Sequence, residues 1–346
     1  MGNLRDDLAG PGIEVAETHI SWVFLAEREV WKVKKSVSLG FLDFSTAEKR
    51  KAVCEAEVRL NRRLAPDVYR GVEPITLDAS GRHRFGGSGA PVDWAVHMDR
   101  LADDDRADVR RREGRLTDAH VTRIAEHIAA FHARARWDEA SARFGAVESI
   151  TRIIRDNHEL GREAAIDLLG ETEAHAIETE QLAFLSDHST LFEGRIANGH
   201  VREGHGDLRL EHVYLADDPS DEDEIRVLDC IEFNDRFRFV DVCSDVAFLS
   251  MDLTYHGRGD LAEHFLAHYA QVTNDYDLYS LVGFYESYRA YVRGMVHGIL
   301  AADEGATPSI RGSSKEAAGR YYRLALDSPR ARPRRSDQGF SVSPAV

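Results

Sequence analysis

The first part of the chain shows the alternation of apolar and polar residues that is typical of β-strands. From Thr18 to Val37, two runs rich in β-forming residues flank a charged turn at residues 27–29, which predicts a β-hairpin or two strands of one sheet. Strand patterns return at residues 71–77 and 92–98, on either side of a turn-rich segment. These runs predict a sheet in the N-terminal part of the chain.

A segment with helical spacing lies between these strand patterns. Ser45 and Glu48 match a capping box, and apolar residues then recur at helical intervals up to Pro66. We therefore expect one helix inserted into the sheet. Residues 1–98 form the predicted N-lobe.

From Thr117 onward the apolar spacing is helical, which predicts a larger helical lobe over residues 99–327. Residues 328–346 contain Pro, Ser and four arginines without periodicity, and they are predicted to be a disordered tail. The fold class is therefore α+β, with a small β-rich lobe and a larger helical lobe. Further helices are expected near residues 148–169, 173–188, 241–253, 260–272, 277–302 and 313–326.

One interruption of the helical part carries most of the chemistry. His205-Gly206-Asp207 precedes a predicted strand at residues 213–215, and a second strand at residues 225–228 ends at Asp229. If these strands pair as an antiparallel hairpin, the loop with Asp207 lies beside Asp229. Two such aspartates suit phosphoryl transfer, in which one orients the acceptor hydroxyl and the other holds a metal. The simpler interpretation is a turn and an ordinary strand end.

The run from His205 to His212, followed by Val-Leu-Asp229, resembles the catalytic and metal-binding motifs of the aminoglycoside phosphotransferase family. It is similar in particular to a bacterial branch that is often fused to a C-terminal P-loop ATPase. The resemblance covers roughly residues 12–326. It implies a bilobal, protein-kinase-like fold, ATP as the phosphoryl donor and Mg²⁺ as a cofactor. Residues 32–46, 57–68 and 229–242 also look like signatures of this branch.

Residue by residue, the resemblance implies that Asp207 is the catalytic aspartate and that Asp229 binds the metal. Asp245 matches a structural aspartate that braces the catalytic loop. Glu232 could assist in metal binding or could be an ordinary surface residue.

The resemblance also implies that Lys32 grips the phosphates and that Glu57 pairs with it. A strand lysine that faces a glutamate on the single helix of a small lobe fits this pairing. Lys34 lies on the same strand face as Lys32, so a shift in register is an open alternative, as is a solvated strand lysine.

Other parts of a nucleotide site are expected from position. The backbone of residues 96–101, with Val96 and Met98, would contact adenine where the lobes join. Residues 17–22 would form the loop over the phosphates, although they contain no glycine. The glycines of the run 86–89 are better explained as a turn than as a phosphate site.

The chain departs from the family pattern in two places. His212 stands where the family usually has a metal-binding asparagine. Imidazole is a poor ligand for Mg²⁺ but suits Mn²⁺ or zinc, so Mn²⁺ is an alternative cofactor and the second metal position is open. The chain also lacks a G-x-x-x-x-G-K-[ST] motif, so the ATPase domain often fused to this branch is absent from it.

Composition restricts the partners. The formal net charge of −16 disfavours binding to nucleic acid or to anionic membranes. The three cysteines form no C-x-x-C motif, which fits a reducing compartment, and residues 278–300 contain charges that exclude a membrane span. No secretory signal is visible, so a cytoplasmic location is expected.

The sequence therefore predicts an ATP-dependent kinase that acts on a hydroxyl of a small polar metabolite, such as a sugar or amino sugar. A nucleotide-binding pseudokinase that regulates a partner is the main alternative, and protein-kinase activity is also open. A hydrolase with a His/Asp metal cluster would leave Lys32 and Glu57 without roles. The sequence does not specify the acceptor or the oligomeric state.

Overall fold

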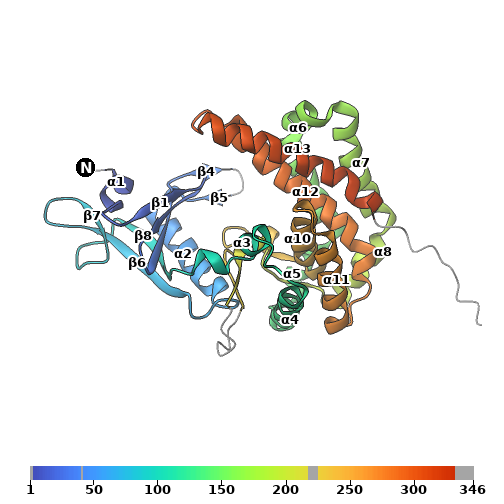
Figure 1. The fold of residues 1–346 in the computed structure, drawn as a ribbon, viewed down its shortest axis with the longest axis horizontal. Coiled ribbons are helices and arrows are strands. Elements are labelled where there is room, and N and C mark those ends of the chain that lie inside the picture. Colours follow the sequence, from blue (N-terminus) through green and yellow to red (C-terminus); the bar gives the residue numbers. More distant parts are fainter. Residues whose placement is uncertain (1–2, 40–41, 217–224, 332–346) are drawn as a thin grey trace, which may run out of the picture.

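The computed structural model describes residues 3–39, 42–216 and 225–331, and it shows two lobes (Figure 1). The smaller lobe is built on a six-stranded sheet, and the larger lobe consists mainly of helices. The bilobal α+β architecture predicted from the sequence is therefore confirmed.

The strands of the small lobe lie in the order β1-β2-β3-β8-β6-β7, and every neighbouring pair is antiparallel. The hairpin predicted around residues 27–29 consists of β2 and β3, and β8 pairs with the other edge of β3 so that Lys32 lies opposite Val96. The bounds are β1 Glu14–Glu17, β2 Ser21–Leu25, β3 Glu29–Lys34, β6 Tyr69–Leu77, β7 His83–Phe85 and β8 Asp93–Asp99, with a separate hairpin of β4 Ser38–Leu39 and β5 Leu42–Asp43.

Helix α2 (Ala47–Asn61) packs on this sheet, as predicted, but it begins differently. Thr46 is the N-cap, and its hydroxyl accepts a hydrogen bond from the Lys49 amide at 3.3 Å. The prediction of Ser45 as the cap was wrong, because its hydroxyl donates to Asp43 instead. A short helix, α1 (Leu4–Leu8), and strand β1 precede the predicted hairpin and were not expected.

The large lobe contains the predicted helices within a few residues of their expected bounds. Short helices such as α3 and α8 were not predicted, because segments of this length show too little periodicity. The helices are α3 Ala107–Arg112, α4 Asp118–Arg134, α5 Glu139–Ala142, α6 Val147–Leu169, α7 Glu171–Asp187, α8 Ser189–Ala197, α9 Asp235–Arg238, α10 Val242–Tyr255, α11 Gly259–Thr273, α12 Leu278–Ala302 and α13 Pro308–Ala331.

The hairpin predicted beside the catalytic loop is present. Strands β10 (Val213–Leu215) and β11 (Ile225–Val227) pair antiparallel, and a second small ladder joins β9 (Val201–Glu203) to β12 (Phe239–Asp241). The segment between these two strands, residues 217–224, lies outside the described residues. Helix α13 ends at Ala331, beyond the predicted start of the tail, and residues 332–346 also lie outside them.

The two lobes share apolar packing where the hairpin meets α2. Leu60 and Leu64 belong to a buried cluster that also includes Val227. The Val227 amide donates to Leu64 O at 3.3 Å, and the Cys230 amide donates to Asn61 Oδ1 at 2.9 Å. The strand that leads to Asp229 is therefore fixed against the small lobe. Within the described residues, no helix combines the length and apolarity that a membrane span requires.

Candidate active site

Lys32 lies at the centre of an ion-pair network between the lobes. Its Nζ is 2.9 Å from Oε1 of Glu57 on α2 and 2.8 Å from Oδ1 of Asp229. Burial favours the neutral amine, but the two carboxylates outweigh this effect and raise the pKa of Lys32 well above its ordinary value. Three residues predicted from separate segments are thus brought together, and Lys32 remains protonated.

Lys34 extends this network. Its Nζ is 2.6 Å from Oε2 of Glu57 and 2.5 Å from Oε1 of Glu232. The side chain of Lys34 is fully buried, whereas that of Lys32 is 15% exposed. Both lysines therefore hold Glu57, but Lys32 is the one that reaches Asp229. Glu232 is no surface residue, because its side chain is 7% exposed and pairs with Lys34.

Asp229 has a left-handed backbone conformation with φ of 63°, which costs a non-glycine residue energy and often marks a functional position. Its side chain is 44% exposed, and its amide donates a 3.4 Å hydrogen bond to the Tyr69 hydroxyl. Partial burial opposes ionisation, but the charge of Lys32 holds the pKa of Asp229 below its usual range. Asp229 is therefore an ionised and accessible carboxylate, as a metal ligand must be.

Asp245 braces the loop that carries Asp207, residues 205–212. Its Oδ2 accepts a hydrogen bond from the His205 amide at 2.6 Å, and its Oδ1 accepts one from the Gly206 amide at 2.8 Å. A Cβ added at Gly204 would lie 2.3 Å from the same carboxylate, so a glycine is needed for this close approach. The geometry fits the bracing role that the family resemblance implies for Asp245.

His205 links the two candidate aspartates. Its Nε2 donates to Leu228 O at 2.8 Å, and its Nδ1 accepts from the Asp207 amide at 3.2 Å. Burial lowers the pKa of His205 to about 4, so the ring is neutral and this tautomer is favoured. One imidazole thus joins the loop of Asp207 to the residue that precedes Asp229.

Asp207 is held by an arginine that the sequence analysis missed. Nε and NH2 of Arg209 donate to Oδ1 and Oδ2 of Asp207, both at 2.9 Å. Burial opposes ionisation of Asp207, but the Arg209 guanidinium outweighs it and lowers the pKa of Asp207 below its usual range. Arg209 is itself 7% exposed and also pairs with Glu211. An arginine two residues after an aspartate is too common in sequences to indicate such a contact.

His212 has one ring nitrogen engaged in the loop. Its Nδ1 donates to Asp207 O at 2.8 Å, and its Nε2 lies 3.4 Å from NH2 of Arg209. In the described ranges, no group of three or more His, Cys, Asp and Glu side chains is arranged to hold a metal ion. The metal-ligand role of His212 stays a prediction, and Nε2 is the atom that could perform it.

Val96 and Met98 are placed differently from what their predicted backbone contacts require. They lie in β8, which is paired with β3 on one side and β6 on the other, so their backbone groups are engaged in the sheet. Their side chains are buried in an apolar cluster against which Leu228 packs. The adenine contact expected for the backbone of residues 96–101 stays a prediction, and β8 ends within this segment at Asp99.

The predicted phosphate loop at residues 17–22 contains the turn between β1 and β2. Lys35 ties it to the end of β3, because its Nζ lies 2.6 Å from Glu17 Oε1 and 2.5 Å from Thr18 O. The glycine run instead follows β7, where Gly86 and Gly87 have positive φ angles. The run forms a turn, as the sequence analysis favoured.

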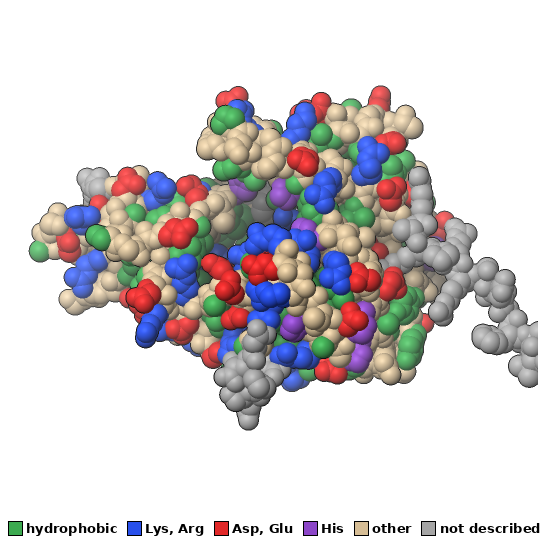
Figure 2. All heavy atoms as spheres, in the orientation of Figure 1, with side chains coloured by type: hydrophobic (Ala, Val, Ile, Leu, Met, Phe, Trp, Pro, Cys, Tyr) green, Lys and Arg blue, Asp and Glu red, His purple; other side chains and the backbone are tan. Residues whose placement is uncertain are grey.

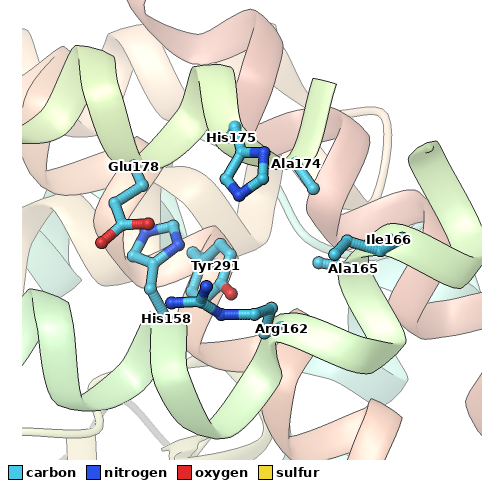
Figure 3. A pocket seen from close by; sticks show the side chains of 8 residues that line it. All are labelled: His158, Arg162, Ala165, Ile166, Ala174, His175, Glu178 and Tyr291. Atoms are coloured by element: carbon cyan, nitrogen blue, oxygen red, sulfur yellow. The ribbon is translucent and has the colours of Figure 1, made fainter. Parts of the chain in front are cut away.

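The surface is hollowed between the small lobe and the helices of the large lobe, and Lys, Arg and His side chains gather around this hollow (Figure 2). A separate small pocket lies between α6, α7 and α12 (Figure 3). In it, His158 stacks on Tyr291 at 3.7 Å and its Nε2 lies 3.0 Å from Gln181 Oε1. These side chains use their polar and aromatic groups in contacts with one another, which indicates that this pocket is a site of helix packing.

The chain has sequence relatives in mycobacteria. It is 37% identical over 286 residues to uncharacterized proteins of Mycobacterium bovis and Mycobacterium tuberculosis. The match covers 83% of this chain and 55% of each relative, so the chain spans about half the length of these curated relatives. No family model matches the chain.

Solved structures with some similarity include small-molecule kinases. A choline/ethanolamine kinase family protein from Mesorhizobium loti is 12% identical, with a TM-score of 0.43 and coverage of 93% of both chains. An ethanolamine kinase of Plasmodium vivax is 10% identical, with a TM-score of 0.46 and coverage of 88% of this chain and 81% of that one. A glucosamine kinase in complex with glucosamine, ADP and inorganic phosphate is 15% identical, with a TM-score of 0.44 and coverage of 90% and 75%. At this level of similarity, function has to be inferred from the site itself.

Proposed function

We propose that the chain is an ATP-dependent phosphotransferase that transfers the γ-phosphate to a hydroxyl of a small polar metabolite. The observation that carries the proposal is the position of Lys32, which joins Glu57 of the small lobe to Asp229 of the large lobe. A strand lysine paired with a helix glutamate, beside an aspartate that follows a hairpin, is the arrangement on which kinases rely. The sequence resemblance to aminoglycoside phosphotransferases supports the same fold and activity.

In this proposal Asp207 orients the acceptor hydroxyl and accepts its proton as the phosphoryl group is transferred. The loop that carries Asp207 is rigid because Asp245 holds two of its amides. Arg209 keeps Asp207 ionised and fixes its carboxylate plane through two parallel hydrogen bonds. The same guanidinium would place positive charge beside the phosphoryl group during transfer.

The residues present fit a magnesium ion that arrives with the nucleotide. Mg²⁺ usually takes one or two protein carboxylates and fills its other positions with phosphate oxygens and waters. Asp229 offers an ionised carboxylate, and the charge of Lys32 lies beside it to grip the phosphates. A bound Mg²⁺ would neutralise charge on the phosphates.

A pseudokinase is the second candidate, and the Asp207–Arg209 contact favours it. Both carboxylate oxygens of Asp207 are occupied by the guanidinium, which competes with an acceptor hydroxyl. A pseudokinase would bind nucleotide and transfer nothing. Acceptor-dependent release of ADP therefore distinguishes the two candidates.

Binding of ATP with Mg²⁺ or Mn²⁺ is expected to raise the melting temperature by several degrees. A ligand at 100 times its Kd that binds the native state alone adds about 2.7 kcal/mol to the free energy of unfolding. Differential scanning fluorimetry measures the shift. Lys32→Met should reduce it, whereas Lys51→Met, on the exposed side of α2, should leave it unchanged. No shift with millimolar nucleotide and either metal would exclude both the kinase and the pseudokinase.

If His212 ligates the second metal, Mn²⁺ is expected to support turnover better than Mg²⁺. An imidazole nitrogen suits Mn²⁺ better, whereas an asparagine offers a hard carbonyl oxygen. His212→Asn should then move the preference towards Mg²⁺ by about tenfold in relative kcat/KM. Paired metal titrations of ATP turnover test this. The same metal preference in both proteins would limit His212 to its hydrogen bond with Asp207 O.

A further inference from the structure

Helix α12 carries a row of basic side chains at intervals of four residues. Arg289, Arg293 and His297 share one face of the helix, while Tyr291 lies on the opposite face in the pocket of Figure 3. NH2 of Arg293 lies 3.2 Å from Nε2 of His297. The charge of Arg293 also helps to lower the pKa of Asp207.

Neither arginine of this row has a carboxylate partner in the part of the chain that the structure describes. Arg289 is 4% exposed, and its Nε and NH2 have no hydrogen-bond acceptor there, nor has Nε of Arg293. The guanidinium of Arg289 lies over the rings of Phe248 and Tyr288, at 4.7 and 5.4 Å from the ring centroids. Asp245 uses its oxygens for the catalytic loop. A buried guanidinium without an anion is costly, and like charges four residues apart on a helix repel each other.

Arg289 also lines a small pocket in the large lobe. Aromatic side chains, among them Phe237, form much of its wall, and Arg236 adds a second guanidinium, which pairs with Asp156 at 3.4 Å. The acid in the wall, Asp241, is not available to Arg289, because Arg195 donates to both of its carboxylate oxygens at 2.7 and 2.8 Å. The pocket is therefore largely apolar, and among the described residues Arg289 brings to it hydrogen-bond donors that have no acceptor.

One wall of this pocket packs on the loop that carries Asp207. A Cβ added at Gly206 would lie 2.7 Å from Phe237 O, so the pocket wall packs directly on the loop. The ring of Phe248 lies 4.7 Å from the guanidinium of Arg289 and 5.9 Å from that of Arg209. One aromatic ring thus separates Arg289 from the arginine that holds Asp207.

We propose that the acceptor carries a carboxylate or phosphate group, which Arg289 binds with support from Arg293. The inference rests on the proposed phosphotransferase function and specifies its substrate class. The acceptor is then an anionic hydroxyl compound, in contrast to the neutral or amino sugar suggested by the sequence. An anion would supply the acceptor that the buried donors lack, and two nitrogens of one guanidinium can bind a carboxylate or phosphate together.

Four ligands with one carbon skeleton test the proposal: glucose, glucosamine, gluconate and glucose 6-phosphate. Isothermal titration calorimetry of the full chain is expected to show tighter binding of gluconate or glucose 6-phosphate than of glucose and glucosamine. Arg289→Gln should lower the binding affinity for the favoured anion by about tenfold or more. Arg323→Gln, an exposed arginine of α13, is the matched control and should leave binding unchanged. Arg289→Lys keeps the charge and should retain part of the affinity.

The outcomes separate the two hypotheses. If glucose or glucosamine binds as well as both anions, or if Arg289→Gln and Arg289→Lys bind like Arg323→Gln, the anion site is wrong. Preference of gluconate over glucose 6-phosphate, or the reverse, identifies the charged group. ADP release measured in the same samples tests the phosphotransferase independently. Anion binding without nucleotide binding would overturn the proposed function and leave the anion site standing.

Discussion

Asp207→Asn is expected to lower acceptor-dependent ADP release by about 10²- to 10⁴-fold, which is the usual contribution of a general base. The asparagine keeps the shape of the side chain but cannot take a proton from the acceptor. Nucleotide affinity should stay near that of the wild type, because Lys32 and Asp229 form the nucleotide side of the network. Steady-state kinetics and calorimetry with ATP and Mg²⁺ measure the two quantities.

Asp229→Asn should be compared with Asp207→Asn in the same two measurements. It should weaken metal–nucleotide binding as well as turnover, because it removes the charge that faces Lys32. Asp187→Asn, on the exposed surface of α7, serves as the neutral control. If Asp207→Asn lost nucleotide binding while Asp229→Asn kept it, the two roles would be reversed. Equal turnover of Asp207→Asn and the wild type would remove Asp207 from the chemistry altogether.

The local architecture of the site could be predicted because it rests on short-range patterns. The two strands of the β10–β11 hairpin alternate in polarity, and antiparallel pairing then places its two ends together. The proximity of the His205–Asp207 loop to Asp229 follows from that pairing. The pairing of Lys32 with Glu57 was implied by the family resemblance, and a single long helix packed on the sheet fits it.

The remaining contacts depend on tertiary packing that has no periodic signal. Alternation places Lys34 on the face of Lys32, but it does not show that Glu232 meets it from the other lobe. Arg209, which holds Asp207, and Arg289, which has no carboxylate partner among the described residues, look like ordinary polar residues in the sequence. The cap of α2 was misplaced by one residue because Ser45 and Thr46 are both good N-caps, and the choice depends on Asp43.

The largest effect on stability is expected for Glu57→Gln. Glu57 is the buried carboxylate between two lysines, with its oxygens 2.9 Å from Lys32 and 2.6 Å from Lys34. Breaking a buried pair by removing one partner typically costs about 3–5 kcal/mol, because the remaining charge stays desolvated. Lys34 is fully buried and would keep Glu232 as its sole remaining partner in the described network. Urea denaturation followed by circular dichroism measures the change in the free energy of unfolding.

A matched control for Glu57→Gln is Glu17→Gln, which breaks the ion pair with Lys35 in the same lobe. The side chain of Glu17 is 49% exposed, so this variant should lose less than about 1 kcal/mol. Lys34→Met combined with Glu57→Gln should cost less than the sum of the two single changes, because each single change already removes the contact between these two residues. Equal losses for Glu57→Gln and Glu17→Gln would contradict the buried network. Additive losses in the double variant would show that Lys34 and Glu57 act independently, against their 2.6 Å contact.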